Sequence, residues 1–254
     1  MSEFTWAPGK AVWRETMTSD LEKAKGFYGE LFGWKFEEMP MPSGSYTMIK
    51  AGERFVGGMM AKPPNMAEIP SHWVTYISVS DVDAAVAGAT KLGGKAVFGP
   101  ETMPGVGRMA TVVDPNGAVL AVMRGEKGDG PLPERPSLGE FCWETLTTPD
   151  GTKSKAFYAA LCGWKTVKGP VSDEMIVFGT DSGEQVADVQ ETKDVPPSWL
   201  TYVVVEKRDA ARARAEKLGA KVLMPSIEVP NVGSIAVVAD PNGAVLGLFQ
   251  PNMG

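Results

Sequence analysis

The stretch Asp114-Pro115-Asn116-Gly117-Ala118-Val119-Leu120 occurs a second time, unchanged, as Asp240-Pro241-Asn242-Gly243-Ala244-Val245-Leu246. Its first four residues suit a hairpin turn, because proline fixes φ and Asn-Gly accepts a positive φ. The apolar residues that follow predict a strand. Such a turn carries no chemistry on its own, but its repetition indicates that the chain contains the same folding unit twice.

The repetition extends well beyond this turn. The further pairs of matching segments are Trp13 with Trp143, Phe27-Tyr28 with Phe157-Tyr158, Gly33-Trp34-Lys35 with Gly163-Trp164-Lys165, Trp73 with Trp199, and Thr75-Tyr76 with Thr201-Tyr202. The second copy is shorter between Trp164 and Trp199, so we expect loop or strand edge there, where chain length changes at little cost. A duplicated unit of this size predicts two similar domains.

Each half contains a fainter repeat of its own, because Ser19-Asp20-Leu21 returns as Ser80-Asp81-Val82. In the first copy Ser19 or Asp20 suits a helix N-cap, apolar residues follow at helical spacing, and Gly33 suits the left-handed end of a helix. Short apolar runs between turn residues then predict three strands. We therefore expect an α+β fold built from four βαβββ modules, two in each half.

The segment 125–137 is rich in glycine, proline and charge, which is typical of a linker. It predicts a first domain over 1–124 and a second over 138–254. The modules are expected at 8–62, 71–124, 139–191 and 197–250, and they are called modules one to four below.

The composition excludes several classes of protein. A formal charge of −6 and a pI near 5.0 argue against nucleic acid as a partner, since phosphates require clustered Lys and Arg. No apolar run approaches the roughly 20 residues of a membrane helix, and the N-terminal residues lack the features of a signal peptide. Cys142 and Cys162 are interpreted as reduced thiols of a cytoplasmic protein. The single histidine, His72, is expected in an exposed loop before a strand.

In its order of strand, Asp-capped helix, Leu-Gly and late Asp-Pro-Asn-Gly hairpin, the chain resembles the glyoxalase/bleomycin-resistance/dioxygenase superfamily, also called vicinal oxygen chelate proteins. Within this superfamily it is most similar to tandem-domain proteins often labelled as hydroxylases. The segments that carry the resemblance are 18–34, 80–93 and 114–117 in the first half, and 141–143, 157–164 and 240–243 in the second. The resemblance implies that each pair of modules forms a half-open barrel whose concave cup holds a ligand.

Metal-dependent members of this superfamily hold a divalent cation in the cup. The resemblance places the corresponding positions at Trp13, Met59, Val74 and Ala121 in the first domain and at Trp143, Asp188, Leu200 and Gly247 in the second. Of these residues only Asp188 offers the oxygen or nitrogen donor that such metals require. We predict that neither cup binds the family metal, and we expect no cofactor.

The cups are then expected to be lined largely by aromatic residues and methionines, which suit adaptable apolar pockets. Plain core packing is the alternative for each of them. The candidate ligand-binding residues are Trp13, Met17, Met48, Met59, Thr75 and Tyr76 in the first domain, and Trp143, Thr145, Met175, Tyr202 and Phe249 in the second.

Two charged residues distinguish the first domain. Glu15 lies two residues after Trp13, so it shares a strand face with it, and the second domain has Thr145 there. Arg108 corresponds to Ser234. We hypothesise that Glu15 is a general base or hydrogen-bond acceptor and that Arg108 anchors an anionic or carbonyl oxygen in the same cup. Exposed surface charges are the alternative.

Three classes of function stay open. The favoured one is a metal-free protein that binds a small, largely apolar molecule for sequestration, carriage or resistance. The second is a lyase, isomerase or hydrolase that uses Glu15 and Arg108, and the third is a protein that acts through its surface. The expected partner is a small molecule rather than nucleic acid or a membrane, and a homodimer is left open.

Overall fold

The structure, a computed structural model, describes residues 5–41, 44–172 and 174–252. Module one consists of β1 (Ala11–Thr18), α1 (Leu21–Phe32), β2 (Lys35–Met41), β3 (Gly44–Ala51) and β4 (Arg54–Ala61), followed by a short 3-10 turn, η1 (Pro64–Met66). Module two consists of β5 (His72–Ser78), α2 (Val82–Lys91), β6 (Lys95–Met103), β7 (Gly107–Val113) and β8 (Val119–Gly125).

The second half repeats this plan. Module three consists of β9 (Phe141–Thr148), α3 (Gly151–Cys162), β10 (Lys165–Val167), β11 (Ile176–Gly179) and β12 (Gln185–Glu191). Module four consists of β13 (Ser198–Val204), α4 (Arg208–Lys217), β14 (Lys221–Val229), β15 (Gly233–Ala239) and β16 (Val245–Pro251). The βαβββ order therefore occurs four times, as the sequence predicted. The shortened stretch of the second half is the connection between β12 and β13, which spans 192–197, whereas the connection between β4 and β5 spans 62–71 and contains η1.

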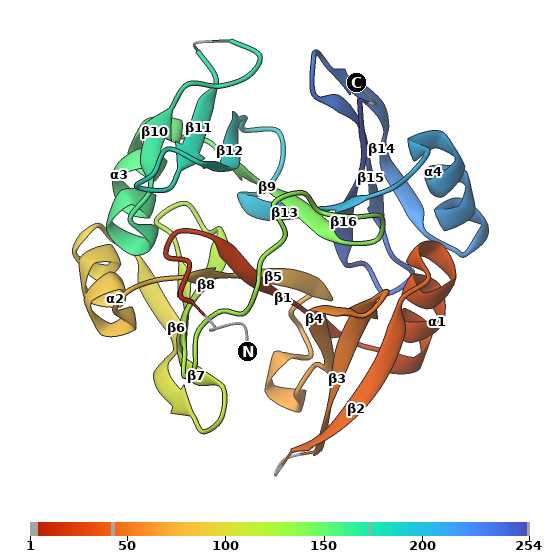
Figure 1. The fold of residues 1–254 in the computed structure, drawn as a ribbon, viewed down its shortest axis with the longest axis horizontal. Coiled ribbons are helices and arrows are strands. Elements are labelled where there is room, and N and C mark those ends of the chain that lie inside the picture. The colour runs from red at the N-terminus through yellow and green to blue at the C-terminus, as the bar shows by residue number, and fades with distance from the viewer. Residues whose placement is uncertain (1–4, 42–43, 173, 253–254) are drawn as a thin grey trace. The chain divides into compact units, whose positions relative to one another are not determined.

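The strands form two eight-stranded sheets, and the described residues contain four α-helices (Figure 1). The strand order is β2-β3-β4-β1-β5-β8-β7-β6 in one sheet and β10-β11-β12-β9-β13-β16-β15-β14 in the other. This mixed α+β architecture confirms the predicted fold class. Neither sheet closes into a barrel.

The helix ends follow the predicted local chemistry. The Asp20 side chain accepts the N–H of Lys23 at 3.0 Å, and Gly33 ends α1 with a φ of 72°. Asp81 and Asp150 cap α2 and α3 in the same way. Each carboxylate satisfies an N–H group that would otherwise have no partner in the first turn.

By its internal contacts the chain separates into two compact units, and each unit combines modules from both halves. The first comprises the chain up to Val12 with Val74–Glu134 and Glu144–Trp199, which is essentially modules two and three. The second comprises Trp13–Trp73, Arg135–Trp143 and Leu200–Gly254, essentially modules one and four. The boundaries of the units therefore do not coincide with those of the two sequence repeats.

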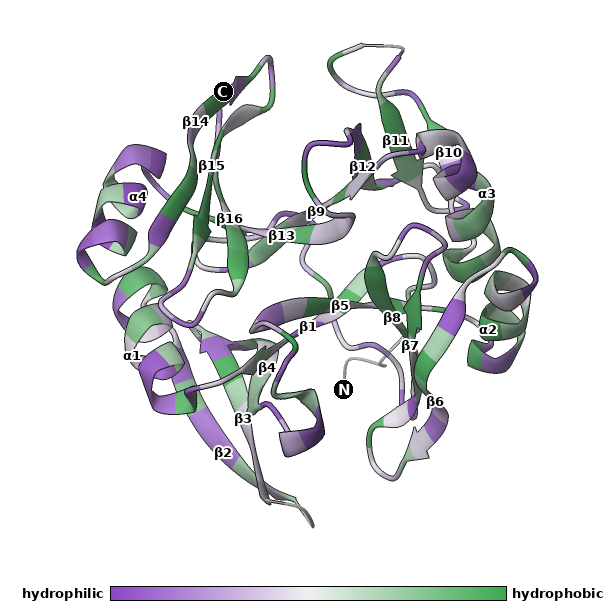
Figure 2. Ribbon diagram, turned by 180° about the vertical axis from the view of Figure 1, so that it is seen from behind, coloured by the Kyte–Doolittle hydropathy of each residue, from purple (hydrophilic) through white to green (hydrophobic). Residues whose placement is uncertain are grey.

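Each unit has its own hydrophobic core, built between paired helices and strands. In the first unit α2 and α3 lie side by side, and the core includes Ile77, Leu120, Phe157 and Leu161. In the second unit α1 and α4 lie side by side, and Figure 2 shows the hydrophobic colour of β15 and β16, which contribute to its core. The apolar residues that follow Asp20 at helical spacing include Phe27, Tyr28 and Leu31, which are buried on one face of α1.

The Asp-Pro-Asn-Gly turns contribute directly to these cores. In the first unit Asp114 Oδ1 accepts the N–H groups of Asn116, Gly117 and Ala118, while Oδ2 accepts the Tyr158 hydroxyl at 3.0 Å. The indole of Trp199 donates to the same Tyr158 oxygen at 2.9 Å. The repeated aspartate thus closes its own turn and ties that turn to a buried tyrosine of another module, which is a structural role.

Candidate functional site

The two faces of the sheet in module one carry different kinds of residue. Met59 is fully buried in the core under α1, and Thr16 pairs with it in register, so both belong to the face that packs on the helices. Because side chains alternate along a strand, Trp13, Glu15 and Met17 belong to the opposite face, called the helix-distal face below. Met59 was predicted to bind ligand, but it is a core residue.

A chain of hydrogen bonds links three side chains on the helix-distal face of module one. The Trp13 indole N–H donates to Tyr46 Oη at 2.9 Å, and the Tyr46 hydroxyl donates to Glu15 Oε2 at 2.8 Å. Glu15 is only 7% exposed although it is charged. A carboxylate held in this way is preorganised, because its position is fixed before any ligand arrives.

Gly58 makes this arrangement sterically feasible. It pairs with Glu15 on β1 and with Met48 on β3. A β-carbon at residue 58 would overlap the hydroxyl and ring of Tyr46. The Tyr46 side chain therefore lies across the backbone of Gly58 to reach Glu15, and a larger residue at position 58 would exclude it.

Methionines surround this hydrogen-bonded group. Met17 of β1 pairs with Met60 of β4. Met48 lies on the same face as Glu15, because both residues pair with Gly58. All three are half-buried. The helix-distal face of module one thus combines one fixed carboxylate with an adaptable apolar surface, and it includes Trp13, Met17 and Met48, which remain predicted ligand-binding residues. Tyr46 was missed, although a tyrosine two residues before Met48 has the spacing that places it on the same face.

Arg108 does not fit the predicted role. Side chains alternate between the two faces of β7, so Arg108 lies on the same face as Ala110 and Val112. Ala110 and Val112 pack in the core beside α2, so Arg108 lies on the helix face. Its guanidinium donates to Asp83 of α2, with Nη2 2.7 Å from Oδ1, and to the Thr102 hydroxyl at 3.0 Å. This pairing raises the pKa of Arg108 and lowers that of Asp83, in both cases chiefly through the hydrogen bond. Arg108 is thus an ion-pair partner of a helix and not an anchor in a cup.

Module four shows what replaces this ion pair. Ser234 occupies the position of Arg108, and it pairs with Glu228 on β14, as Arg108 pairs with Thr102 on β6. The arginine is instead on the helix, where Arg208 Nη1 lies 2.7 Å from Glu228 Oε1. Both modules therefore have an ion pair between helix and sheet. In module two the arginine is on the strand, as Arg108, and in module four it is on the helix, as Arg208.

The equivalent face of module three has a different polar group. The Thr145 hydroxyl donates to Asp188 Oδ1 at 2.6 Å, and the two residues pair in register between β9 and β12. Met175 is half-buried just before β11. The sequence predicted Thr145 and Met175 as ligand-binding residues. It named Asp188 only at a metal position and did not predict its hydrogen bond with Thr145.

The remaining predicted residues lie in several environments. Thr75 is buried and donates to Glu144 Oε2 at 2.8 Å, and Glu144 is itself 1% exposed. Tyr202 is buried against Gly247, where a β-carbon would overlap its ring. Tyr76 is buried and pairs with Ala121. Trp143 and Phe249 are half-buried. Thr75 thus has a structural hydrogen bond, while ligand binding by the four aromatic residues remains a prediction.

The single histidine and the cysteines have no catalytic arrangement in the described residues. His72 is the first residue of β5 rather than part of the preceding loop, it is half-buried, and its Nδ1 lies 2.7 Å from the Pro70 carbonyl oxygen. Burial raises the pKa of the Cys162 thiol well above its usual value. Both cysteines are free thiols, and a thiol with a raised pKa is a poor nucleophile.

The donor groups do not fit the divalent metal of the superfamily. Among residues 5–41, 44–172 and 174–252, no three His, Cys, Asp or Glu side chains lie close enough together to hold a metal ion. The helix-distal carboxylates Glu15 and Asp188 have a phenol and a threonine hydroxyl as hydrogen-bond partners. A divalent cation needs several such donors around one point.

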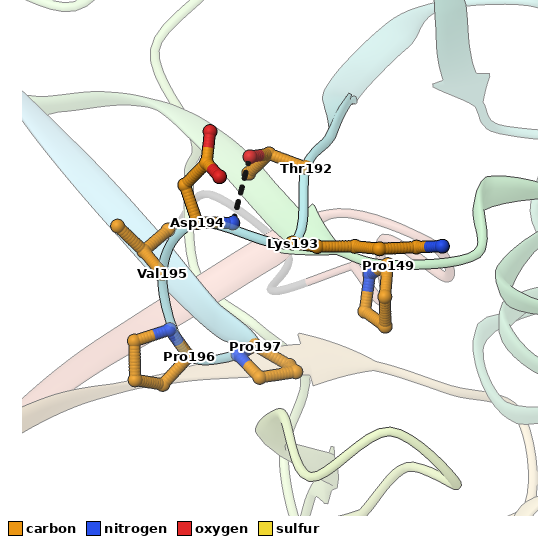
Figure 3. Close-up of a pocket in the computed structure, with 7 residues that line it drawn as sticks. All are labelled: Pro149, Thr192, Lys193, Asp194, Val195, Pro196 and Pro197. Carbon is orange, nitrogen blue, oxygen red and sulfur yellow. Dashed lines mark hydrogen bonds between the residues drawn. The ribbon is translucent and has the colours of Figure 1, made fainter.

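Two shallow pockets are lined by other residues. One, of about 370 Å³, is formed by the loop between β12 and β13 and is lined by Pro149 and residues 192–197 (Figure 3). There the backbone N–H of Asp194 donates to the Thr192 hydroxyl at 3.1 Å. The other, of about 260 Å³, lies in the second unit between the end of α1 and the start of α4. Neither pocket includes a residue that the sequence predicted to bind ligand.

The sequence matches two family models in tandem. Residues 13–122 match the model described as Glyoxalase/Bleomycin resistance protein/Dioxygenase superfamily, and residues 143–249 match a Glyoxalase-like domain. In the described part of the chain, no helix has the length and apolar character needed to cross a membrane.

Curated relatives match over nearly their whole length. "Putative glyoxylase CFP32" of Mycobacterium bovis is 30% identical over 249 residues, which cover 96% of this chain and 95% of that protein. "Anthracycline biosynthesis protein DauV" of Streptomyces sp. strain C5 is 28% identical over 262 residues, covering 96% and 94%.

Solved structures show the same fold at low identity. The Mn(II)-bound glyoxalase from Novosphingobium aromaticivorans matches with a TM-score of 0.64 and 16% identity, covering 96% of this chain and 82% of the other. Homoprotocatechuate 2,3-dioxygenase from Arthrobacter globiformis matches with a TM-score of 0.65 and 16% identity, covering 98% and 82%. At this level of identity the likeness concerns the fold alone.

Proposed function

Because the chain belongs to the Glyoxalase/Bleomycin resistance protein/Dioxygenase superfamily, we propose that it binds a small, largely apolar molecule without a bound metal. The observation that supports this function is the hydrogen-bonded chain from Trp13 through Tyr46 to Glu15 on a methionine-rich face. The sequence domains 1–124 and 138–254, joined by the linker 125–137, are part of the proposal.

The chemistry of this face suits a mostly apolar ligand with one hydrogen-bond donor. Met17, Met48 and Met60 offer flexible, polarisable side chains that adapt to an irregular apolar surface. Glu15 supplies a fixed acceptor, whose position Tyr46 maintains through a bond of 2.8 Å. Apolar contacts would then supply most of the affinity, and the carboxylate would orient the bound molecule.

The proposal is tested by titrating the whole protein with Nile red, a neutral apolar dye whose fluorescence increases in an apolar site. We expect saturable binding that Trp13→Ala weakens about tenfold, since it removes both apolar area and the donor to Tyr46. Trp6→Ala is the matched control, because Trp6 is also partly exposed but its indole donates to the Gly125 carbonyl and not to Tyr46. Equal losses in the two variants, or no saturable binding, would refute the proposal.

A second candidate function is supported by the burial of Glu15. A carboxylate that is 7% exposed and held by a phenol can serve as a general base, so a lyase, isomerase or hydrolase activity that uses Glu15 is the alternative. Native mass spectrometry of the freshly purified protein identifies any co-purified molecule. An enzyme would convert that molecule during incubation and lose this conversion in Glu15→Gln, whereas a binding protein would release it unchanged.

A further inference from the structure

The pocket between α1 and α4 of the second unit is a groove with a fixed apolar floor. It has a volume of about 260 Å³, and its apolar side chains are those of Leu31, Phe32, Leu138, Val204 and Val205. The Phe32 ring packs on Trp34, with 4.8 Å between the ring centroids. Gly139 accepts the Trp34 indole N–H at 2.7 Å and donates to the Val204 carbonyl at 2.9 Å. The floor is therefore in place before any ligand arrives.

The corresponding helix pair of the first unit is packed closely where this groove opens. By the offsets of the repeats, Gly88 of α2 is the counterpart of Arg214, and Cys162 of α3 is the counterpart of Phe32. A β-carbon at residue 88 would lie 3.5 Å from the Ala160 carbonyl oxygen of α3. The long side chains of Arg214 and Phe32 do not permit such a close approach, so a groove lies between α1 and α4.

The mouth of the groove carries two cations. Lys207 and Arg214 line it, and both are exposed. The ion pairs of α4 involve Arg208 and Arg212, and among the described residues no carboxylate lies within 4 Å of the charged nitrogens of Lys207 or Arg214. Glu206 is the one acidic residue among the described residues of the lining, and it is exposed. Both cations are thus available to an anionic ligand.

The start of α4 also differs from that of α2. In α2 the Asp81 carboxylate accepts the N–H of Ala84 at 3.0 Å. Lys207 replaces this aspartate in α4, and its side chain forms no cap hydrogen bond with the described residues. Ala210, the counterpart of Ala84, lines the groove. A ligand carboxylate next to Lys207 would therefore take the place of the aspartate that caps α2.

We propose that this groove binds a small amphipathic carboxylate, an anion with an apolar chain. The chain packs against Phe32 and Leu138, and the carboxylate forms charge-assisted hydrogen bonds with Lys207 and Arg214. Leu138 is 59% exposed, so a bound chain removes apolar surface from water. The inference does not rest on the proposed function, because the groove shares no residue with the methionine-rich face of module one.

Octanoate, octanol and acetate are matched probes, because octanol lacks the carboxylate and acetate lacks the chain. Two-dimensional NMR of the whole protein is expected to show saturable octanoate shifts at the amides of Gly139, Val205 and Ala211. Octanol and acetate should each bind at least about tenfold more weakly, since one loses the charged hydrogen bonds and the other loses the apolar contacts.

Variants of the start of α4 test the role of charge. Lys207→Asp, which copies Asp81 of α2, should weaken octanoate binding at least about tenfold, while the melting temperature should not fall because the new aspartate can cap α4. Glu206→Gln removes a like charge and should strengthen binding about twofold. Lys217→Gln is the control, since Lys217 is an exposed lysine in the last turn of the same helix and does not line the groove.

Three results would overturn the proposal: no octanoate shifts at these amides, equal binding of octanol or acetate, or equal losses from Lys207→Asp and Lys217→Gln. A second copy of the chain is the other possible occupant, and shifts of the same amides with protein concentration alone would assign the groove to a dimer instead. Trp13→Ala should leave octanoate binding unchanged, and Lys207→Asp should leave Nile red binding unchanged. Each of the two proposals can therefore fail without the other.

Discussion

The buried hydroxyl of Tyr28 donates to Asp240 Oδ2 at 2.9 Å, although the two residues are 212 positions apart in the chain. The Trp73 indole N–H donates to the same hydroxyl oxygen at 2.9 Å, and Asp240 Oδ1 accepts the N–H groups of Asn242 and Ala244. Module one is thereby joined to the Asp-Pro-Asn-Gly turn of module four. Tyr158 and Asp114 make the equivalent contact in the other unit.

Replacing Tyr28 by Phe should destabilise the protein by about 2 kcal/mol, because the buried Asp240 carboxylate loses a charge-assisted hydrogen bond and the Trp73 N–H loses its acceptor. Urea unfolding measures the change in the free energy of unfolding. Tyr158→Phe should have a similar effect, while Glu30→Gln, at an exposed position of α1, should have none. A Tyr28→Phe protein as stable as wild type would show that this contact is energetically neutral.

The same tyrosines predict a loss of stability at high pH. Burial, followed by the nearby aspartate, raises the pKa of Tyr28 and Tyr158 well above the ordinary value of 10.0. Above that value the unfolded chain releases both protons while the folded protein retains them, so the free energy of unfolding falls as pH rises. The expected slope is at most about 1.4 kcal/mol per pH unit for each tyrosine. Below the ordinary value their contribution is constant.

Urea unfolding of wild type and of the Tyr28→Phe/Tyr158→Phe double variant, between neutral pH and pH above 10, tests this linkage. The double variant should lose less stability across that range, although it is less stable at neutral pH. The raised pKa of Cys162 acts in the same direction, so Cys162→Ala should also flatten the dependence. Identical slopes in wild type and the double variant would contradict the assignment.

Arg108→Met should leave Nile red binding unchanged, since the Arg108 side chain is 37% exposed and pairs with Asp83 on the helix face. Its effect on the free energy of unfolding should be small and should decrease with added salt, because exposed ion pairs are screened. A double-mutant cycle with Asp83→Asn measures the free energy of interaction between Arg108 and Asp83. A large loss of dye affinity in Arg108→Met would restore the predicted binding role.

Gly58→Ala should destabilise the protein by about 1–3 kcal/mol, the range for overpacking, because the new methyl group overlaps Tyr46. In the background of Tyr46→Met, which copies Met175 of module three, the same substitution should cost much less. Thermal unfolding of the wild type, the two single variants and the double variant gives the coupling free energy between positions 46 and 58. An equal cost in both backgrounds would show that Tyr46 does not restrict position 58.

Dialysis against EDTA should leave both the melting temperature and Nile red affinity unchanged, because Glu15 and Asp188 lie among donors too few for a divalent cation. Elemental analysis of protein purified without chelator should find less than one equivalent of Zn, Ni, Mn or Fe. Stoichiometric metal, with loss of dye binding on its removal, would refute the metal-free proposal.

Much of the local structure could be predicted from the sequence. The cap at Asp20, the end of α1 at Gly33 and the Asp-Pro-Asn-Gly turns depend on contacts between neighbouring residues, so short spacings predict them. The repeat of Trp13 as Trp143, together with the fainter repeat of Ser19-Asp20-Leu21 as Ser80-Asp81-Val82, likewise indicated four similar modules. Parts of the candidate site followed from strand alternation, which correctly placed Glu15 on the face of Trp13 and Met17.

By itself, then, the sequence determined the four modules, their helix caps and turns, and the faces of β1, because these depend on local spacing. The tertiary structure decided which modules share a core and which polar groups meet. Asp240 belongs with Tyr28, Arg108 with Asp83, and Asp188 with Thr145. These partners come from segments distant along the chain, so their choice depends on packing and register, which no spacing within one segment contains.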